Sequence, residues 1–157
     1  MTATATADYV LTIAQDMFSA MVDGEPGLVT GWDGAAADIL DPVNAWVDVR
    51  SAEPVRALVT TERATAEHIT RALLGMEPDE AVAGDDMQDA FGEIANVIGG
   101  NLKGLMPEGG TLTLPIVTSG PTGMLGTPAW ECHLEWRAAP IVIALWQLPT
   151  DGKVPTP

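Results

Sequence analysis

Residues 85–106 read DDMQDAFGEIANVIGGNLKGLM, and this stretch decides how the rest of the chain can fold. At 100° per residue its apolar side chains fall within one sector, which predicts an amphipathic helix with one face in a core. The apolar face comprises Phe91, Ile94, Ala95, Ile98, Leu102 and Leu105. On the opposite side, a narrow polar line is predicted to face solvent, formed by Asp89, Glu93, Asn96, Gly100 and Lys103.

Both ends of this helix carry sequence signals. Asp85 is the predicted N-cap, and Gln88 three residues later is placed to complete a capping box. Gly104 and then Pro107 are typical of a helix end. The helix is therefore expected to run from about residue 85 to residue 104.

Three glycines stand inside the predicted helix, at Gly92, Gly99 and Gly100. Each costs about 1 kcal/mol relative to alanine, so a reason is required. One interpretation is that missing bulk lets another macromolecule bring its backbone close to Glu93 and Asn96. The other is that the glycines let a neighbouring helix or sheet of this chain pack closely.

The flanking sequence predicts two more helices and several strands. Helical spacing runs from Asp8 to Asp23 and from Thr61 or Thr65 to Met76. Alternation of apolar and polar residues predicts a hairpin over 43–50 and 54–61, then strands over 111–119, 129–137 and 141–148. Pro115 puts the first of these three strands at an edge or a bulge, whereas the last is apolar enough to be central. Residues 1–7 are expected to fray, and residues 35–40 to form a short helical turn.

This order of elements predicts an α+β domain in which long helices cover one face of a largely antiparallel sheet. The 157 residues suffice for one domain with a real core, which we expect over residues 1–148. Residues 149–157 are expected to be a disordered tail.

The composition excludes several functions. A formal net charge of −15, with only 7 Lys and Arg residues, argues against nucleic acid and anionic lipid as partners. We find no signal peptide and no apolar run of about 20 residues, so a cytoplasmic location is expected. No metal site is expected, because Cys132 is the single cysteine and the two histidines lie far apart. Cys132 is interpreted as a buried, inert thiol and His68 as a solvated helix residue.

The polar line matches a known pattern. Asp89-x-x-x-Glu93-x-x-Asn96, within DAFGEIANVIGGNLKGLM, resembles the active-site helix of the CheC, CheX and FliY chemotaxis phosphatases. The run is most similar to CheX-like sequences, which carry one copy of the motif. The resemblance implies an α+β fold that agrees with the predicted elements, and it implies a homodimer by analogy.

The resemblance also implies a reaction, the hydrolysis of the aspartyl phosphate on the receiver domain of a CheY-like response regulator. Asn96 would position the attacking water, and Glu93 would pair with a lysine of the partner. Asp89, Gly100 and Lys103 would belong to the binding surface. The Mg²⁺ ion would be held by the phosphorylated partner, and this chain would bind no cofactor.

Two other interpretations remain open at this point. The chain can be a non-catalytic CheX-like module that captures a response regulator or a motility component without turnover, because fold does not determine function. Alternatively, Asp89, Glu93 and Asn96 can be merely the solvated side of a helix in a structural protein.

Overall fold

Most of the stretch 85–106 forms the helix that its periodicity predicts, α3 (Gly84–Gly104). The structure is a computed structural model that describes residues 3–36 and 38–150. Phe91, Ile94 and Ile98 on α3 are at most 1% exposed and belong to the hydrophobic core. Leu105, which was predicted to join them, is 40% exposed. That prediction is wrong because the helix ends at Gly104, one residue earlier.

The start of α3 differs from the predicted capping box. The Ala83 N–H donates to Asp86 Oδ2 at 3.2 Å, so Asp86 caps the helix in place of the Asp85–Gln88 pair. Gln88 instead bonds to a strand: Nε2 donates to the Pro115 carbonyl at 3.0 Å, and Oε1 accepts from the Val117 N–H at 3.2 Å. Gln88 therefore attaches the first turns of α3 to the sheet edge.

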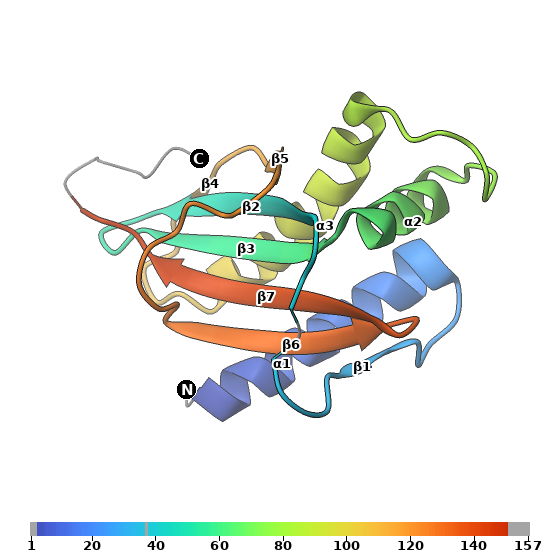
Figure 1. Cartoon of the computed structure of the whole chain (residues 1–157). Helices are drawn as coiled ribbons and strands as arrows, with labels where there is room; N and C mark the ends of the chain where they lie inside the picture. Colours follow the sequence, from blue (N-terminus) through green and yellow to red (C-terminus); the bar gives the residue numbers. More distant parts are fainter. Residues whose placement is uncertain (1–2, 37, 151–157) are drawn as a thin grey trace.

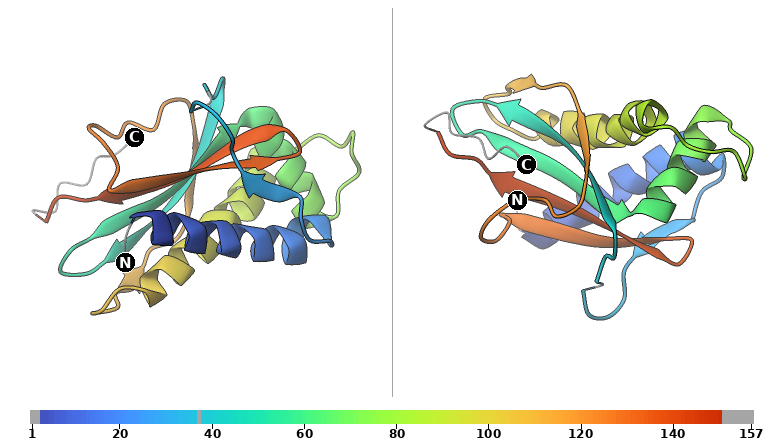
Figure 2. Two further views of the ribbon diagram at one scale, coloured as in Figure 1. Left: turned by 90° about the horizontal axis from the view of Figure 1, so that it is seen from below. Right: turned by 45° about the horizontal axis from the view of Figure 1, so that its top comes forward.

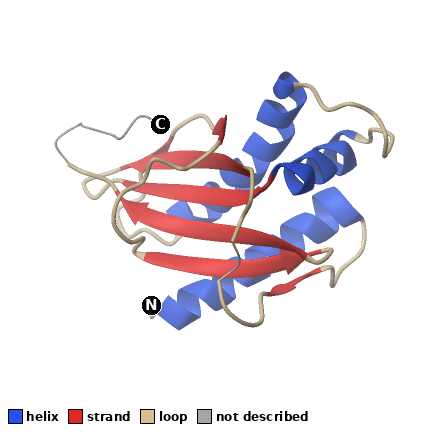
Figure 3. Cartoon of the chain, viewed as in Figure 1, coloured by secondary structure: helices blue, strands red, loops and turns tan. Residues whose placement is uncertain are grey.

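The sheet has seven strands, and every pairing in it is antiparallel. The strands are β1 (Val29–Gly31), β2 (Pro42–Arg50), β3 (Val55–Glu62), β4 (Thr111–Leu112), β5 (Ile116–Ser119), β6 (Trp130–Trp136) and β7 (Ala139–Gln147). Their order is β1-β6-β7-β3-β2-β4, with β5 also paired to β2 (Figures 1 and 3). Strand β7 is central, as its apolar sequence predicts.

The single strand predicted over 111–119 is divided into two, β4 and β5, which pair with successive parts of β2. Pro115 has no N–H to donate and lies in the gap between them. Thr113 bridges the gap, because its N–H donates to the Asp48 carbonyl and its hydroxyl accepts from the Asp48 N–H, both at 2.9 Å.

Three helical segments complete the fold: α1 (Ala3–Met17), the π-helix η1 (Phe18–Asp23) and α2 (Arg63–Leu74). Figure 2 shows α1 and α3 on the same face of the sheet, with α2 at one end. The core lies between these helices and the sheet, and its large members include Phe18, Phe91 and Trp136. The predicted fold class, helices on one face of an antiparallel sheet, is confirmed.

The N-terminal third departs from prediction in three places. Helix α1 begins at Ala3, so fraying is wrong for residues 3–7, while residues 1–2 lie outside the described part. Ala7 packs against the core, and its carbonyl accepts from Cys132 Sγ at 3.7 Å, so sheet contacts extend the helix. Strand β1 was not predicted. The helical turn expected over 35–40 is absent from the described residues there, and Ala37 and the tail 151–157 lie outside them.

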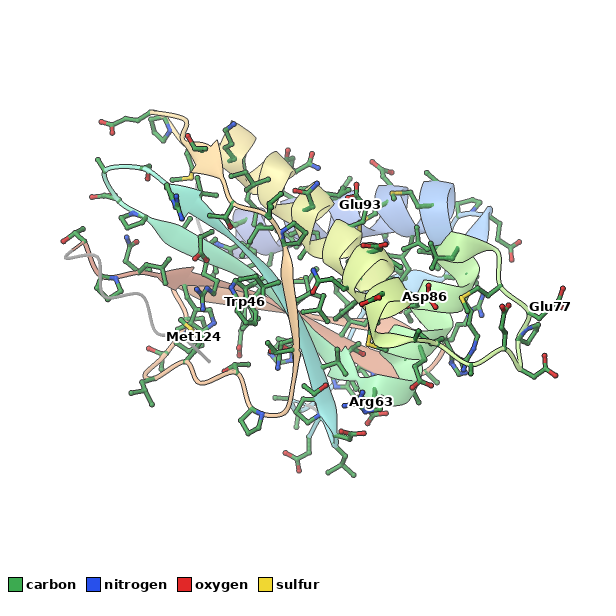
Figure 4. The ribbon with its side chains drawn as sticks, turned by 90° about the horizontal axis from the view of Figure 1, so that it is seen from above. Trp46, Arg63, Glu77, Asp86, Glu93 and Met124 are labelled. Atoms are coloured by element: carbon green, nitrogen blue, oxygen red, sulfur yellow. The ribbon has the colours of Figure 1, made fainter. Side chains whose placement is uncertain are left out.

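The second face of the sheet carries a buried polar cluster, the Arg56 cluster, formed by Asp48, Arg56, Trp46 and Met124. Arg56 Nε and its terminal nitrogen bond the two Asp48 carboxylate oxygens at 2.7 and 3.0 Å. Its guanidinium carbon lies 4.8 Å from the Trp46 ring centroid, and Met124 contacts it from the β5–β6 loop. Figure 4 shows Trp46 and Met124 on the side of the strands away from α3.

Cys132 is buried, as expected. Burial raises the pKa of its thiol above the ordinary cysteine value, and the nearby negative charge of Asp8 adds to the increase. Because the thiolate is the reactive form, a raised pKa makes this cysteine a weak nucleophile.

Candidate functional site

The five residues of the predicted polar line do lie along one side of α3, which we call the α3 ridge: Asp89, Glu93, Asn96, Gly100 and Lys103. Asp89 and Gly100 are exposed, and the other three are half-buried. Figure 4 shows Glu93 on the side of α3 that faces away from the strands. With a rise of about 1.5 Å per residue, Lys103 lies roughly 10 Å beyond Asn96, at the far end of the ridge.

Glu93 and Asn96 contact each other at the centre of the α3 ridge. Asn96 Nδ2 donates to Glu93 Oε2 at 3.4 Å, which is a long hydrogen bond. Because a carboxylate only accepts hydrogen bonds, the amide must turn its NH₂ group toward Glu93 and its carbonyl oxygen away. Among the described residues, the Asn96 carbonyl oxygen has no hydrogen-bond partner. The pair therefore presents one outward acceptor beside one carboxylate.

The structure assigns the three helix glycines to different causes. A Cβ at Gly99 would overlap the Cγ2 methyl of Val47, and one at Gly92 would lie 3.3 Å from the Pro115 ring. These two glycines permit close packing against the sheet. A Cβ at Gly100 would meet nothing within 4 Å. Of the two interpretations, packing thus explains Gly92 and Gly99, whereas Gly100 leaves open space next to Asn96.

Gly99→Ala is expected to destabilise the fold, because its methyl group collides with Val47, a buried side chain with little rotamer freedom. Overpacking of this kind costs about 1–3 kcal/mol in the free energy of unfolding. Gly100→Ala is the matched control, and there the better helix propensity is expected to add up to about 1 kcal/mol. Urea unfolding of the two variants measures the difference. Equal stabilities would contradict the close packing of Gly99 on β2.

A groove that the sequence did not reveal runs between α1 and α3, beside the α3 ridge. Its volume is about 260 Å³. Its lining is largely apolar and comprises Ile13, Asp16, Met17, Ala20, Met21, Val97 and Asn101. Val97 follows Asn96 directly, so the groove and the ridge form one continuous surface. The methionines of the first helix were the available signal, but their spacing indicates core just as well.

The charges on α3 are divided by sign along the helix. Asp85 and Asp86 lie in the first turn and Lys103 in the last, an arrangement that the helix dipole favours. Asp89 and Glu93 continue the acidic half as far as Asn96. A bare phosphate would be repelled there, so an anionic group must arrive with its own cations. Among the described residues, no cluster of His, Cys, Asp and Glu is arranged to hold a metal ion.

The fold and the site together define a class of protein: a helix-covered antiparallel sheet whose longest described helix displays an acid and an amide to the outside. A family model described as chemotaxis phosphatase CheX matches residues 43–129, which is more than half of the chain. The chain belongs to the CheX family. The matched region contains α3 with its whole ridge.

Solved structures of the same fold agree with this assignment. CheX from Desulfovibrio desulfuricans superposes with a TM-score of 0.65 at 20% identity, covering 90% of this chain and 97% of its own. The CheX-CheY-BeF3-Mg²⁺ complex from Borrelia burgdorferi gives 0.67 at 14% identity, covering 89% and 96%. A CheC-like protein from a Shewanella species gives 0.57 at 19%, covering 88% and 95%. No curated protein sequence matches the chain.

The sequence also led us to expect no membrane-spanning helix and a homodimer. In the part of the chain that the structure describes, no helix has the length and apolar character needed to cross a membrane. The homodimer implied by the resemblance stays a prediction.

Proposed function

We propose that this chain hydrolyses the aspartyl phosphate on the receiver domain of a CheY-like response regulator. The observation that carries the proposal is the outward-facing Asn96 carbonyl oxygen, held beside Glu93 on an open helix ridge of a CheX-family chain. A CheX protein of the same fold forms a complex with CheY, BeF3 and Mg²⁺, which supports a receiver domain as the partner.

In this proposal Asn96 aligns the attacking water. Its carbonyl oxygen accepts a hydrogen bond from the water, whose lone pair then points at phosphorus, opposite the leaving aspartate oxygen. The phosphorus–oxygen bond to the partner's aspartate breaks as the bond to water forms, and inorganic phosphate is released. Positioning and electrostatic stabilisation supply most of the acceleration in phosphoryl transfer, so no nucleophile from this chain is needed.

In this proposal Glu93 binds the partner and does not act as a general base. A carboxylate close to a phosphoryl group repels it unless a cation lies between them. Pairing Glu93 with a lysine beside the partner's phosphorylation site removes this repulsion and sets the register of docking. The Mg²⁺ ion is then supplied by the partner, and Asp89 extends the acidic surface that receives the partner's cations.

The rest of the surface contributes contact area. The apolar groove between α1 and α3 adjoins the α3 ridge at Val97 and can take an apolar side chain of the receiver domain. Gly100 leaves room for the partner's backbone near Asn96. Lys103, at the distant end of the ridge, makes at most a peripheral contact.

The test is the decay of a phosphorylated receiver domain with and without this chain, run beside a binding measurement. Faster decay supports the phosphatase. Binding without faster decay would instead establish the non-catalytic module, and the absence of both would leave only a structural role for the α3 ridge. Because binding and turnover are read separately, each outcome selects one of the three interpretations.

Glu93→Gln is expected to weaken binding to the receiver domain about tenfold or more, because it removes one member of a charged hydrogen-bonded pair. Glu53→Gln, a change of the same charge on the exposed β2–β3 turn, is the matched control and should leave affinity unchanged. Titration of each variant with the receiver measures the dissociation constant. Equal affinities for wild type and Glu93→Gln would remove the docking role of Glu93.

A further inference from the structure

A cavity unrelated to the α3 ridge lies beside the second half of α2. Its volume is about 420 Å³, within the range of small-molecule sites. It is lined by His68, Arg71, Ala72, Met76, Pro78 and Arg137. The whole chain has only 7 Lys and Arg residues and 2 His. Two of those arginines and one of those histidines line this one cavity, and no carboxylate belongs to its described lining.

Arg71 is fixed in place by the chain that follows α2. Its Nε donates to the Glu80 carbonyl at 2.8 Å, and a terminal nitrogen lies 3.5 Å from the Glu67 carboxylate, one helical turn earlier. Its side chain is 16% exposed. The guanidinium is therefore held at the cavity wall before any ligand arrives.

Arg137 approaches from the turn between β6 and β7. A terminal nitrogen lies 3.1 Å from the buried Asp23 carboxylate, and the guanidinium carbon lies 4.5 Å from the Trp136 ring centroid. Arg137 and Ala138 have φ angles of 50° and 65°, in the left-handed region where such turns favour Asn-Gly. A two-residue hairpin turn requires such angles at both positions, so the turn fixes where the Arg137 side chain leaves the backbone.

Both arginines retain N–H donors that the bonds described above do not use. A guanidinium has five N–H donors, and the bonds just described use only some of them. Among the described residues, no other acceptor bonds either side chain. The rest of the lining is apolar, formed by Ala72, Met76 and Pro78. The cavity thus combines two cationic donors, Arg71 at 16% and Arg137 at 54% side-chain exposure, with apolar lining residues.

We propose that this cavity binds a small organic anion. Its phosphate or carboxylate group lies between Arg71, Arg137 and His68, and its apolar part lies against Met76 and its apolar neighbours. Asp23 and Glu67 balance the two arginines from outside the cavity, and the chain as a whole is strongly negative. The net negative charge of the chain would repel a polyanion, whereas a compact anion can enter the cavity and reach the arginine donors directly.

Proton NMR at constant pH tests the proposal, because the chain has one histidine in the cavity and one outside it. The probes are phenyl phosphate, benzoate, inorganic phosphate and phenol. Phenyl phosphate or benzoate should shift the His68 imidazole resonance saturably and leave His133 on β6 unmoved, and the tighter of the two identifies the head group. Inorganic phosphate, without the ring, should bind more weakly, and phenol should not bind.

Arginine variants connect the signal to the cavity. Arg137→Gln and, independently, Arg71→Gln should weaken binding of the tighter probe about tenfold, because each removes hydrogen bonds to a charged group. Arg63→Gln, at the start of α2 and outside the cavity, is the control and should bind normally, with thermal unfolding confirming that each variant is folded. No saturable shift in the wild type, equal binding of phenol, or equal weakening by Arg63→Gln would overturn the proposal.

Discussion

Replacing Asn96 with alanine is expected to slow dephosphorylation of the receiver domain by this chain on the order of a hundredfold, while affinity for the receiver stays within about twofold. Alanine removes the outward carbonyl oxygen that would hold the attacking water in the proposed mechanism, and it leaves the Glu93 carboxylate in place. Loss of one positioned transition-state hydrogen bond has an effect of this size in other enzymes. Single-turnover decay of the phosphorylated receiver, at saturating concentrations of this chain, isolates the chemical step.

Asn101→Ala is the matched control for this experiment. Asn101 lies on the same helix, but its amide donates to the Val97 carbonyl at 2.8 Å, within α3 itself. Asn101 lines the groove, so its loss can change affinity for the receiver domain, but at saturating concentrations of this chain we expect the decay rate to remain near that of wild type. If both asparagine variants slowed the reaction equally, or if Asn96→Ala kept the wild-type rate, Asn96 would not be the water-positioning residue.

Arg56→Met is expected to lower the free energy of unfolding by about 3–5 kcal/mol. The substitution leaves the Asp48 carboxylate without its partner at a site where the two side chains are 5% and 15% exposed. A buried charge that loses its partner keeps the whole cost of leaving water. The contact of the guanidinium with the Trp46 ring is lost as well. Chemical denaturation monitored by tryptophan fluorescence measures the change.

Two companion variants separate this explanation from a general sensitivity to arginine loss. Asp48→Leu combined with Arg56→Met removes both charges and should recover most of the lost stability. Arg63→Met breaks the exposed pair with Asp41, whose side chains are 38% and 65% exposed, and should change stability by less than about 1 kcal/mol. A double variant no more stable than Arg56→Met alone would refute the unpaired-charge explanation.

The elements that were predictable from sequence are those whose local pattern agrees with their surroundings. Helix α3 has both an apolar sector and an end signal, and the β2–β3 hairpin has clear alternation, so both form where expected. Strand β1 could not be predicted, because its three residues lack a periodic pattern and pair only through contact with β6. The early start of α1 has the same cause, since core contacts at Ala7 outweigh weak helix propensity.

The alternating pattern in β2 and β3 does not reveal how one face of the sheet is covered. The alternation places Trp46 and Arg56 on the sheet face away from the helices, and this face is covered there, because the two residues are 3% and 4% exposed. Part of the cover comes from the β5–β6 loop, whose Met124 contacts Arg56, and no local pattern in β2 or β3 reveals where this distant loop will fold. Contacts between residues distant in sequence also explain Gln88. Its spacing suggests a capping box, but its side chain bonds the edge strand instead.

The α3 ridge was easier to predict from sequence than the cavity beside α2, for a related reason. All five α3 ridge residues lie on one helix, so helical periodicity alone is enough to align them. The groove between α1 and α3 and the cavity at α2 each combine residues from distant segments. His68 was interpreted as a solvated helix residue, and its exposure agrees, but only the fold brings Arg137 near it.

The contact between Gly99 and Val47 has a consequence for how the chain meets a partner. With no clearance between α3 and β2, the helix cannot turn about its own axis without displacing a buried strand residue. The backbone of Asn96, three residues earlier, therefore keeps its position relative to the sheet whether or not another protein is present. The entropy of orienting the helix against the sheet is lost once, during folding, so binding a partner does not require that part of the alignment to be repeated.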